Sequence, residues 1–274
     1  MPTAEQRGFW AAIRANPADD TARLVYADWL QENGDEPRAE FIRLQCRIAS
    51  VAGDQKARRK VLPGLEHRQR VLRTANAARW GEPLFRALVR TGSGVSLEAW
   101  TRTLSYERGF VTDLRTDLDA AHRLATAGPD LEPVLALDVK HEWAKYNRRK
   151  LVELFAWDGV GCVRQFSFLG ATDECVGSVV ASTAARLTHL QFSSGQVTDA
   201  GAALLANWPC AAGLLSLGLT ANRIGDAGAL ALAGSPHLNR LEALYLYDNP
   251  LGRAGRRALV SRFGGNAYLP EEPA

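Results

Sequence analysis

A repeat of 27 residues in the C-terminal half of the chain constrains its fold more than any other feature. Small and apolar residues recur at this step in six aligned columns, without a gap. Self-similarity at a period of about 20 to 50 residues is typical of stacked repeats, in which each unit completes its neighbour's core. The columns are Leu187, Leu214 and Leu241; Leu190, Leu217 and Leu244; Phe192, Leu219 and Leu246; Val197, Ile224 and Leu251; Gly201, Gly228 and Gly255; and Leu205, Leu232 and Leu259.

Each unit begins with the pattern L-x-x-L-x-L, whose alternation predicts a strand with one buried face. Asn222 and Asn249 follow the strands of the second and third units, where an asparagine side chain can bond backbone groups of the turn. Gly195 holds this column in the first unit. We expect Asp199 and Asp226 to be the N-caps of the helices that come next.

These units resemble the leucine-rich repeat of the ribonuclease-inhibitor type, clearest over residues 187–264. The resemblance implies an α/β fold, a solenoid with parallel strands on its concave side and helices on its convex side. Weaker units precede the clear ones, for a total of about six strands, and a final helix with a short terminal strand closes the array. The weaker strands are expected at 110–117, 134–139 and 163–168, with helices at 119–128, 149–157 and 174–182.

The N-terminal part reads as a set of helices. Thr3 and Gln6 form a capping box before the first helix, and a second helix is expected from Asp20 to Asn33, with Gly34 as its C-cap. Pro37 suits the first turn of a third helix, and a fourth helix is expected to end near Trp80.

Residues 15–45 also resemble the repeat-companion domain of bacterial proteins, a helical module that stands ahead of repeats. The phrases "ARWGEPL" (78–84) and "ERGFVTDL" (107–114) continue this resemblance. It implies a helical domain at 1–106, a leucine-rich-repeat solenoid at 107–269 and a tail at 270–274. It implies architecture and no defined chemistry.

Charges crowd the stretch from Arg23 to Gln45, which poses the question of an active site. Asp28 beside Trp29 could act as a general base if its pKa were raised. The alternative, which we favour, is that Asp28 and Glu40 pair with Arg38, Arg43 or backbone donors and lock two helices together. Catalysis would also need a nucleophile, a metal or oxyanion donors nearby, and the sequence offers none.

Composition adds few constraints. The net charge of +3 does not by itself indicate nucleic acid. No apolar run approaches the ~18 residues of a membrane helix, and no signal peptide is recognisable. We expect no membrane association, no metal, no cofactor and a cytoplasmic location. Four dispersed cysteines are expected to be buried thiols: Cys46, Cys162, Cys175 and Cys210.

The outward positions of the repeat strands are the best candidates for a binding site. Where leucines point into the core, the alternate residues point to solvent. Tyr245 and Tyr247 stand out, since tyrosine is enriched at interface hot spots. The predicted partner-binding residues are His189, Gln191, Ser216, Thr220, Tyr245 and Tyr247.

The sequence therefore predicts a non-catalytic scaffold that recognises a protein partner through the concave face. One alternative is an enzyme or enzyme subunit that uses the N-terminal acidic cluster. Another is a nucleic-acid binder that uses two basic segments, 56–73 and 140–150, the latter with Trp143 and Tyr146 among its cations. The commoner explanation for both segments is a solvated helix face or a loop on the solenoid, and contact with an acidic protein is a further alternative.

Overall fold

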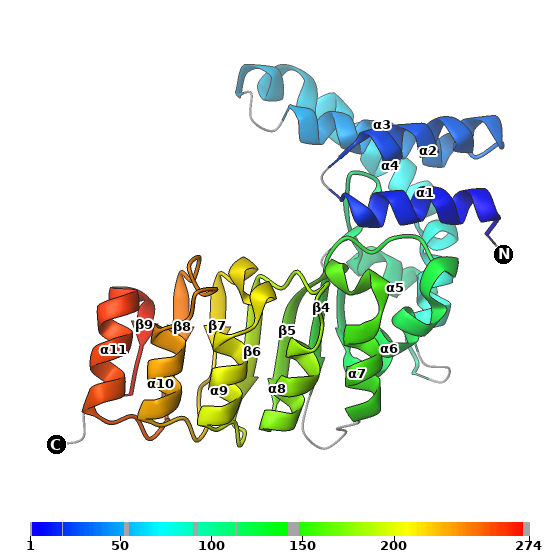
Figure 1. The fold of residues 1–274 in the computed structure, drawn as a ribbon. Coiled ribbons are helices and arrows are strands. Elements are labelled where there is room, and N and C mark those ends of the chain that lie inside the picture. Colours follow the sequence, from blue (N-terminus) through cyan, green and yellow to red (C-terminus); the bar gives the residue numbers. More distant parts are fainter. Residues whose placement is uncertain are drawn as a thin grey trace. The chain divides into compact units, whose positions relative to one another are not determined.

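The computed structural model describes residues 2–17, 19–51, 55–89, 93–112, 114–141 and 148–270. The chain forms two compact units (Figure 1). The helical unit comprises Met1–Leu114 with Thr126–Leu137, and the repeat unit comprises Arg115–Ala125 with Asp138–Ala274. The domain boundary expected at residue 106 stays a prediction.

The helical unit begins with the helices that local signals predicted. The Thr3–Gln6 capping box is present, and Gly34 has the positive φ of 83° that favours glycine after a helix. Pro37 lies in the first turn of the third helix. The helices are α1 (Ala4–Ala15), α2 (Thr21–Glu32), α3 (Glu36–Ser50), α4 (Gln55–Leu88) and α5 (Leu97–Thr103).

Two predictions about this region were wrong. Helix α4 does not end near Trp80 but continues through Pro83 to Leu88, because Leu84 and Leu88 are buried and their packing extends the helix. Residues 110–117 do not form one strand. Strand β2 (Phe110–Thr112) is fully buried and pairs antiparallel with β1 (Ser105–Glu107), whereas β3 (Leu114–Asp117) joins another sheet.

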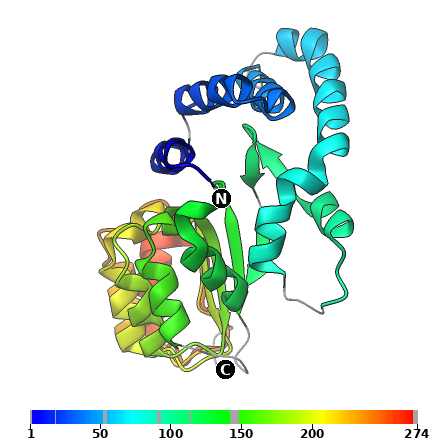
Figure 2. The same ribbon diagram turned by 90° about the vertical axis from the view of Figure 1, so that its right-hand side faces the viewer.

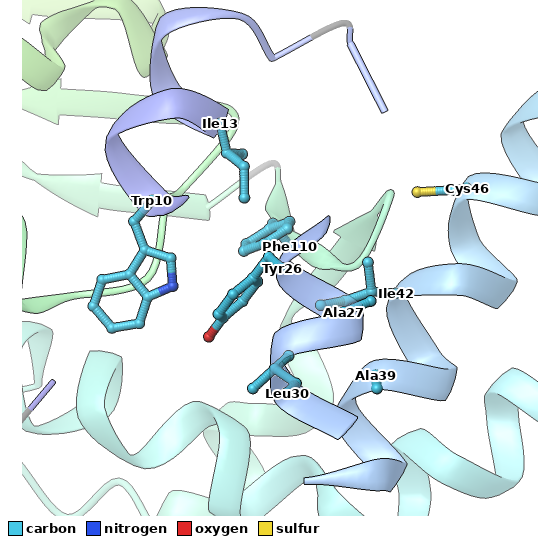
Figure 3. Close-up of a cluster of buried hydrophobic side chains, with 9 residues drawn as sticks. All are labelled: Trp10, Ile13, Tyr26, Ala27, Leu30, Ala39, Ile42, Cys46 and Phe110. Carbon is cyan, nitrogen blue, oxygen red and sulfur yellow. The ribbon is translucent and has the colours of Figure 1, made fainter. Parts of the chain in front are cut away.

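The core of the helical unit is aromatic (Figure 3). Tyr26 of α2 lies at its centre, with ring centroids 6.1 Å from Trp29 and 6.2 Å from Phe110. Burial raises the pKa of the Cys46 thiol to about 12, so this cysteine is a neutral packing group. Cys46 and Cys175 are buried as expected, but Cys162 and Cys210 are only half-buried. The cluster consists of Trp10, Ile13, Tyr26, Ala27, Leu30, Ala39, Ile42, Cys46 and Phe110.

Ion pairs join the helices around this core. The Nη2 atom of Arg43 donates to Asp28 Oδ1 at 2.6 Å, which links α3 to α2 as predicted. Glu40 does not pair with Arg38 or Arg43, because Arg68 of α4 donates to both of its carboxylate oxygens at 2.6 Å. The Arg68 guanidinium lowers the pKa of Glu40. The acids of the stretch from Arg23 to Gln45 therefore clamp α2, α3 and α4 together.

The repeat unit is built on one sheet with the strand order β3-β4-β5-β6-β7-β8-β9 among the described residues. This makes seven strands where about six were expected, and the strands from β5 to β9 pair in parallel. The later strands are β4 (Leu137–His141), β5 (Val163–Leu169), β6 (His189–Ser193), β7 (Ser216–Gly218), β8 (Ala243–Tyr245) and β9 (Ala267–Tyr268).

Among the described residues, the helices of this unit cover one face of the sheet and leave its other face without a helix layer of their own (Figures 1 and 2). The arrangement confirms an α/β fold that fits leucine-rich repeats; its curvature into a solenoid stays a prediction. The helices are α6 (Leu118–Ala127), α7 (Arg148–Ala156), α8 (Asp173–Val180), α9 (Asp199–Ala206), α10 (Asp226–Ala233) and α11 (Arg253–Phe263).

The 27-residue columns stack as expected. Leu190 lies opposite Leu217, and Leu217 lies opposite Leu244, in neighbouring parallel strands. All three leucines are buried, with at most 1% of their surface exposed. Each unit thus places its strand leucines against those of the next unit, and burial of this continuous apolar surface holds the array together.

Two buried asparagines connect the units further. Asn222 donates to the carbonyl of Leu219 in its own turn at 3.0 Å and to Phe192 of the preceding unit at 2.8 Å. Its Oδ1 atom accepts from the Val197 backbone at 3.1 Å. Asn249 repeats this pattern one unit later. The predicted asparagine turn is confirmed, and it also bonds a neighbouring unit, which the repeat alone did not predict.

The expectation that Asp199 and Asp226 are N-caps of their own helices was wrong. Thr198 is the N-cap of α9, and Asp199 is the first residue of that helix. The Asp199 carboxylate instead accepts from Gly225 and Gly228 at 2.7 and 2.9 Å, at the start of α10. A side chain at Gly228 would collide with that carboxylate, which explains the glycine column.

The asparagine contacts predict a stability effect. Asn222→Ala leaves the Val197 N–H and the Phe192 and Leu219 carbonyls without their side-chain partner in the interior, so we expect a loss of about 2–4 kcal/mol in the free energy of unfolding. Asn207→Ala, which removes an exposed helix-end contact, should cost less than about 1 kcal/mol. Urea unfolding of both variants measures the difference; equal losses would contradict the structural role of Asn222.

The Glu40–Arg68 pair predicts a pH effect. Because the folded-state pKa of Glu40 is lowered, the pair stabilises the protein above the unfolded-state pKa of about 4.3, and this contribution disappears as pH falls through the folded-state pKa. Glu40→Gln should lower Tm at pH 7 by less than about 4 °C, and this difference should shrink as the pH is lowered below the unfolded-state pKa. Glu66→Gln, at an exposed site on α4, is the control. An effect that is independent of pH would contradict this assignment.

Candidate functional site

The face of the sheet opposite the helices carries the outward residues of the strands, and we call it the open strand face. Its residues fall into rows, because parallel pairing places equivalent positions side by side. One row runs Gln165, His189, Ser216 and Ala243. The next runs Ser167, Gln191, Gly218, Tyr245 and Tyr268. A third runs Leu169, Ser193, Thr220 and Tyr247, whose last two members follow their strands at the 27-residue step.

Three tyrosines gather at the end of this face near β9. The rings of Tyr245 and Tyr268 are stacked, with centroids 4.8 Å apart and planes 15° apart. The ring centroid of Tyr247 lies 6.4 Å from that of Tyr268. Tyr247 and Tyr268 are 42% and 38% exposed. A preformed aromatic surface of this kind offers contact area at little cost in side-chain entropy.

The middle of the open strand face carries short or polar side chains that project little from the sheet. Gly218 has no side chain because Gln191 lies over it: a Cβ atom there would be 2.9 Å from the Gln191 Cγ atom. The amide nitrogen of Gln191 donates to Ser193 Oγ at 2.9 Å, which fixes the orientation of the glutamine. Ser216 and Ala243 add only small side chains. The larger tyrosines therefore border a shallow polar region.

The structure brings the six predicted residues into these rows, but they differ in accessibility. His189, Gln191 and Tyr247 are exposed, whereas Ser216, Thr220 and Tyr245 are half-buried. The rows bring two further contact candidates, Tyr268 and Leu169, into view. Tyr268 could have been found, since it lies in the short terminal strand; Leu169 could not, because it follows the strand pattern recognised at 163–168.

Charge is distributed unevenly over the open strand face. The rows from β5 to β9 carry no acidic side chain, lysine or arginine. Charged outward residues occur on β3 and β4, where Arg115 lies 4.0 Å from Asp138. The rows can therefore form hydrogen bonds and aromatic contacts, while long-range charge attraction contributes little.

The basic segments are partly used within their own units. In 56–73, Arg68 bonds Glu40, and Arg73 donates to the Leu104 carbonyl at 2.7 Å. In 140–150, Lys150 bonds Asp119 at 2.8 Å and Arg149 bonds Glu153 at 2.7 Å. Trp143 and Tyr146 of the second segment lie outside the described residues.

Within the described part of the chain, no group of three or more histidine, cysteine, aspartate or glutamate side chains could hold a metal ion. In the same part, no helix combines the length and the apolar character required to span a membrane.

Comparison with known proteins gives one family match. A model described as "Leucine Rich repeat" matches residues 186–206 and 214–233, each of which covers a strand and the helix after it. None of the curated proteins compared with the chain matches it. The repeat unit therefore contains leucine-rich repeats, the kind of module that commonly mediates protein–protein interaction.

Proposed function

We propose that the chain is a non-catalytic scaffold that recognises a protein partner through the open strand face. The observation that carries this proposal is the row structure of the face, which ends in three contacting tyrosines. The positions are held by paired strands, so little ordering entropy is lost when a partner binds. We further propose that the strand array curves, which would make this face concave and enlarge its contact with a rounded partner.

We extend the proposal to the helical unit, and to the source and the cellular location of the protein. We infer that this unit is a repeat-companion domain of a bacterial, cytoplasmic protein and that it does not catalyse a reaction. Its charged stretch supports a structural role, because Asp28 and Glu40 are each bonded to an arginine of another helix. Each carboxylate is therefore occupied by an arginine, whereas a general base must be free to reach a proton of the substrate.

The proposal predicts which surface is needed to capture a partner. Tyr245→Ala combined with Tyr247→Ala should reduce recovery of the protein partner from source-cell extract at least tenfold, because it removes two of the three contacting rings. The measurement is quantitative mass spectrometry of material that co-purifies with the tagged chain. The control is Leu204→Ala with Leu230→Ala, which removes two exposed apolar side chains from helices α9 and α10.

The dependence of partner binding on salt concentration distinguishes this function from nucleic-acid binding. Contact through uncharged rows should survive an increase from about 50 to 500 mM salt, whereas binding of phosphates by cations weakens steeply. Equal partner recovery by the tyrosine variant, or recovery that depends on nucleic acid and is lost in high salt, would contradict the proposal.

A further inference from the structure

The charge of the open strand face narrows the kind of protein segment that it can bind. Its rows from β5 to β9 carry no acidic side chain, lysine or arginine, and Asp248 lies beyond them, in the turn after Tyr247. A charged segment placed on these rows would lose hydration without meeting an opposite charge. The rows consist mainly of aromatic rings, hydroxyls and amides, so the segment that loses least on binding is an uncharged one.

The three tyrosines supply an apolar platform for such a segment. The rings of Tyr245 and Tyr268 are stacked with centroids 4.8 Å apart, and the Tyr247 ring is tilted by 46° from that of Tyr268. Tyr247 and Tyr268 are exposed. Surfaces lined by aromatic rings are the usual sites at which proline-rich segments dock, because the flat, apolar proline ring packs on the aromatic ring.

Gln191 brings an amide group to this platform. Its side chain leans toward the neighbouring strand, where its Cγ and Cδ atoms lie 2.9 and 3.6 Å from the place of a Cβ atom on Gly218. Gly218 is paired in turn with Tyr245, so the amide lies close to the tyrosines. The amide nitrogen carries two N–H donors, one of which bonds Ser193 Oγ at 2.9 Å. The other is directed to a different acceptor, which a bound segment can provide.

The hydrogen-bonding groups of the face match a segment that has acceptors and few donors. Tyrosine, serine, threonine and glutamine side chains can all donate. A proline-rich segment in the polyproline II conformation presents carbonyl groups without internal hydrogen bonds, and its prolines have no N–H. This face can therefore satisfy the polar backbone groups of such a segment. A β-strand, in contrast, would bind along the edge of a sheet and not on its face.

The spacing of the strands also agrees with the polyproline II conformation. Neighbouring strands of a sheet lie about 4.8 Å apart, so equivalent positions on alternate strands are separated by about 9.6 Å. A polyproline II helix rises about 9.3 Å in each turn of three residues. Strands β6, β7 and β8 follow one another in the sheet (Figure 1). A segment that runs along the row thus meets Tyr245 and Gln191 with residues three apart, and between them it passes Gly218, which adds no side chain.

We propose that the open strand face binds a proline-rich segment of the protein partner, which lies across strands β6 to β9 in the polyproline II conformation. Prolines of the segment pack on the three tyrosine rings, and the Gln191 amide donates to one of its carbonyl groups. This proposal rests on the proposed scaffold function and specifies the chemistry of the partner. Both surfaces are preformed, so binding orders little on either side.

Titration of a fluorescently labelled ten-residue oligoproline with the full chain, followed by anisotropy, tests the proposal. We expect saturable binding of oligoproline and none of an alanine–glutamine peptide of equal length. Tyr247→Ala should weaken the binding at least about fivefold, because it removes an exposed ring, whereas the control Leu204→Ala on helix α9 should leave it unchanged. Equal binding of the two peptides, equal affinity of the two variants, or no binding of oligoproline by the folded wild type would overturn the proposal.

Gln191→Glu tests the role assigned to the amide. The substitution keeps the size of the side chain but replaces its N–H donors with a carboxylate that repels a carbonyl oxygen, so oligoproline should bind at least about fivefold more weakly. Gln165→Glu is the matched control, because it adds the same charge at an exposed position of the row that has no tyrosine. Equal weakening by both substitutions would be a general effect of charge and would overturn the role of Gln191.

The scaffold function and the proline-rich partner can fail separately. If Tyr245→Ala with Tyr247→Ala loses the partner from cell extract but oligoproline does not bind the wild type, the scaffold proposal stands and the proline-rich class is wrong. If that variant keeps the partner, the partner is held by another surface and both proposals fail, whatever oligoproline does.

Discussion

Burial of one aliphatic column against the next is the interaction on which the repeat unit depends. Leu190, Leu217 and Leu244 lie opposite one another in parallel strands and are almost completely excluded from water. A single strand and helix could not bury its own apolar face, so each unit is stable only beside a neighbour. Because this stacking sets the register, it also decides which side chains share a row on the open strand face.

Polar contacts make the stacking specific. Asn222 and Asn249 bond backbone groups of two successive units, and Asp199 bonds the start of the following helix. Such buried groups would be costly in any other register, because they would lose their partners. The hydrophobic columns therefore supply most of the attraction, and the amide and carboxylate contacts select one arrangement. The result is a face whose outward residues are held in place before any partner arrives.

The helical unit is organised differently, around an aromatic core with ion pairs at its surface. Arg43 and Arg68 tie α3 to its two neighbouring helices through Asp28 and Glu40. Arg38 is on the same helix but turns inward, where aromatic rings surround it; its Nε and Nη1 atoms have no hydrogen-bond partner among the described residues. One short stretch of sequence thus contains both the clamps for the helices and a buried arginine.

The sequence by itself determined what depends on local pattern. The period of 27 residues predicted the strands, their buried leucines and the outward placement of Tyr245 and Tyr247, because alternation along a strand is a property of the backbone. Only the tertiary structure decided which residues meet across units. Tyr268 completes the tyrosine cluster through strand pairing, Asp199 bonds the next helix rather than its own, and Glu132 reaches Arg38 across 94 residues of chain. Contacts of this kind depend on how elements pack in space, which residue spacing along one element does not encode.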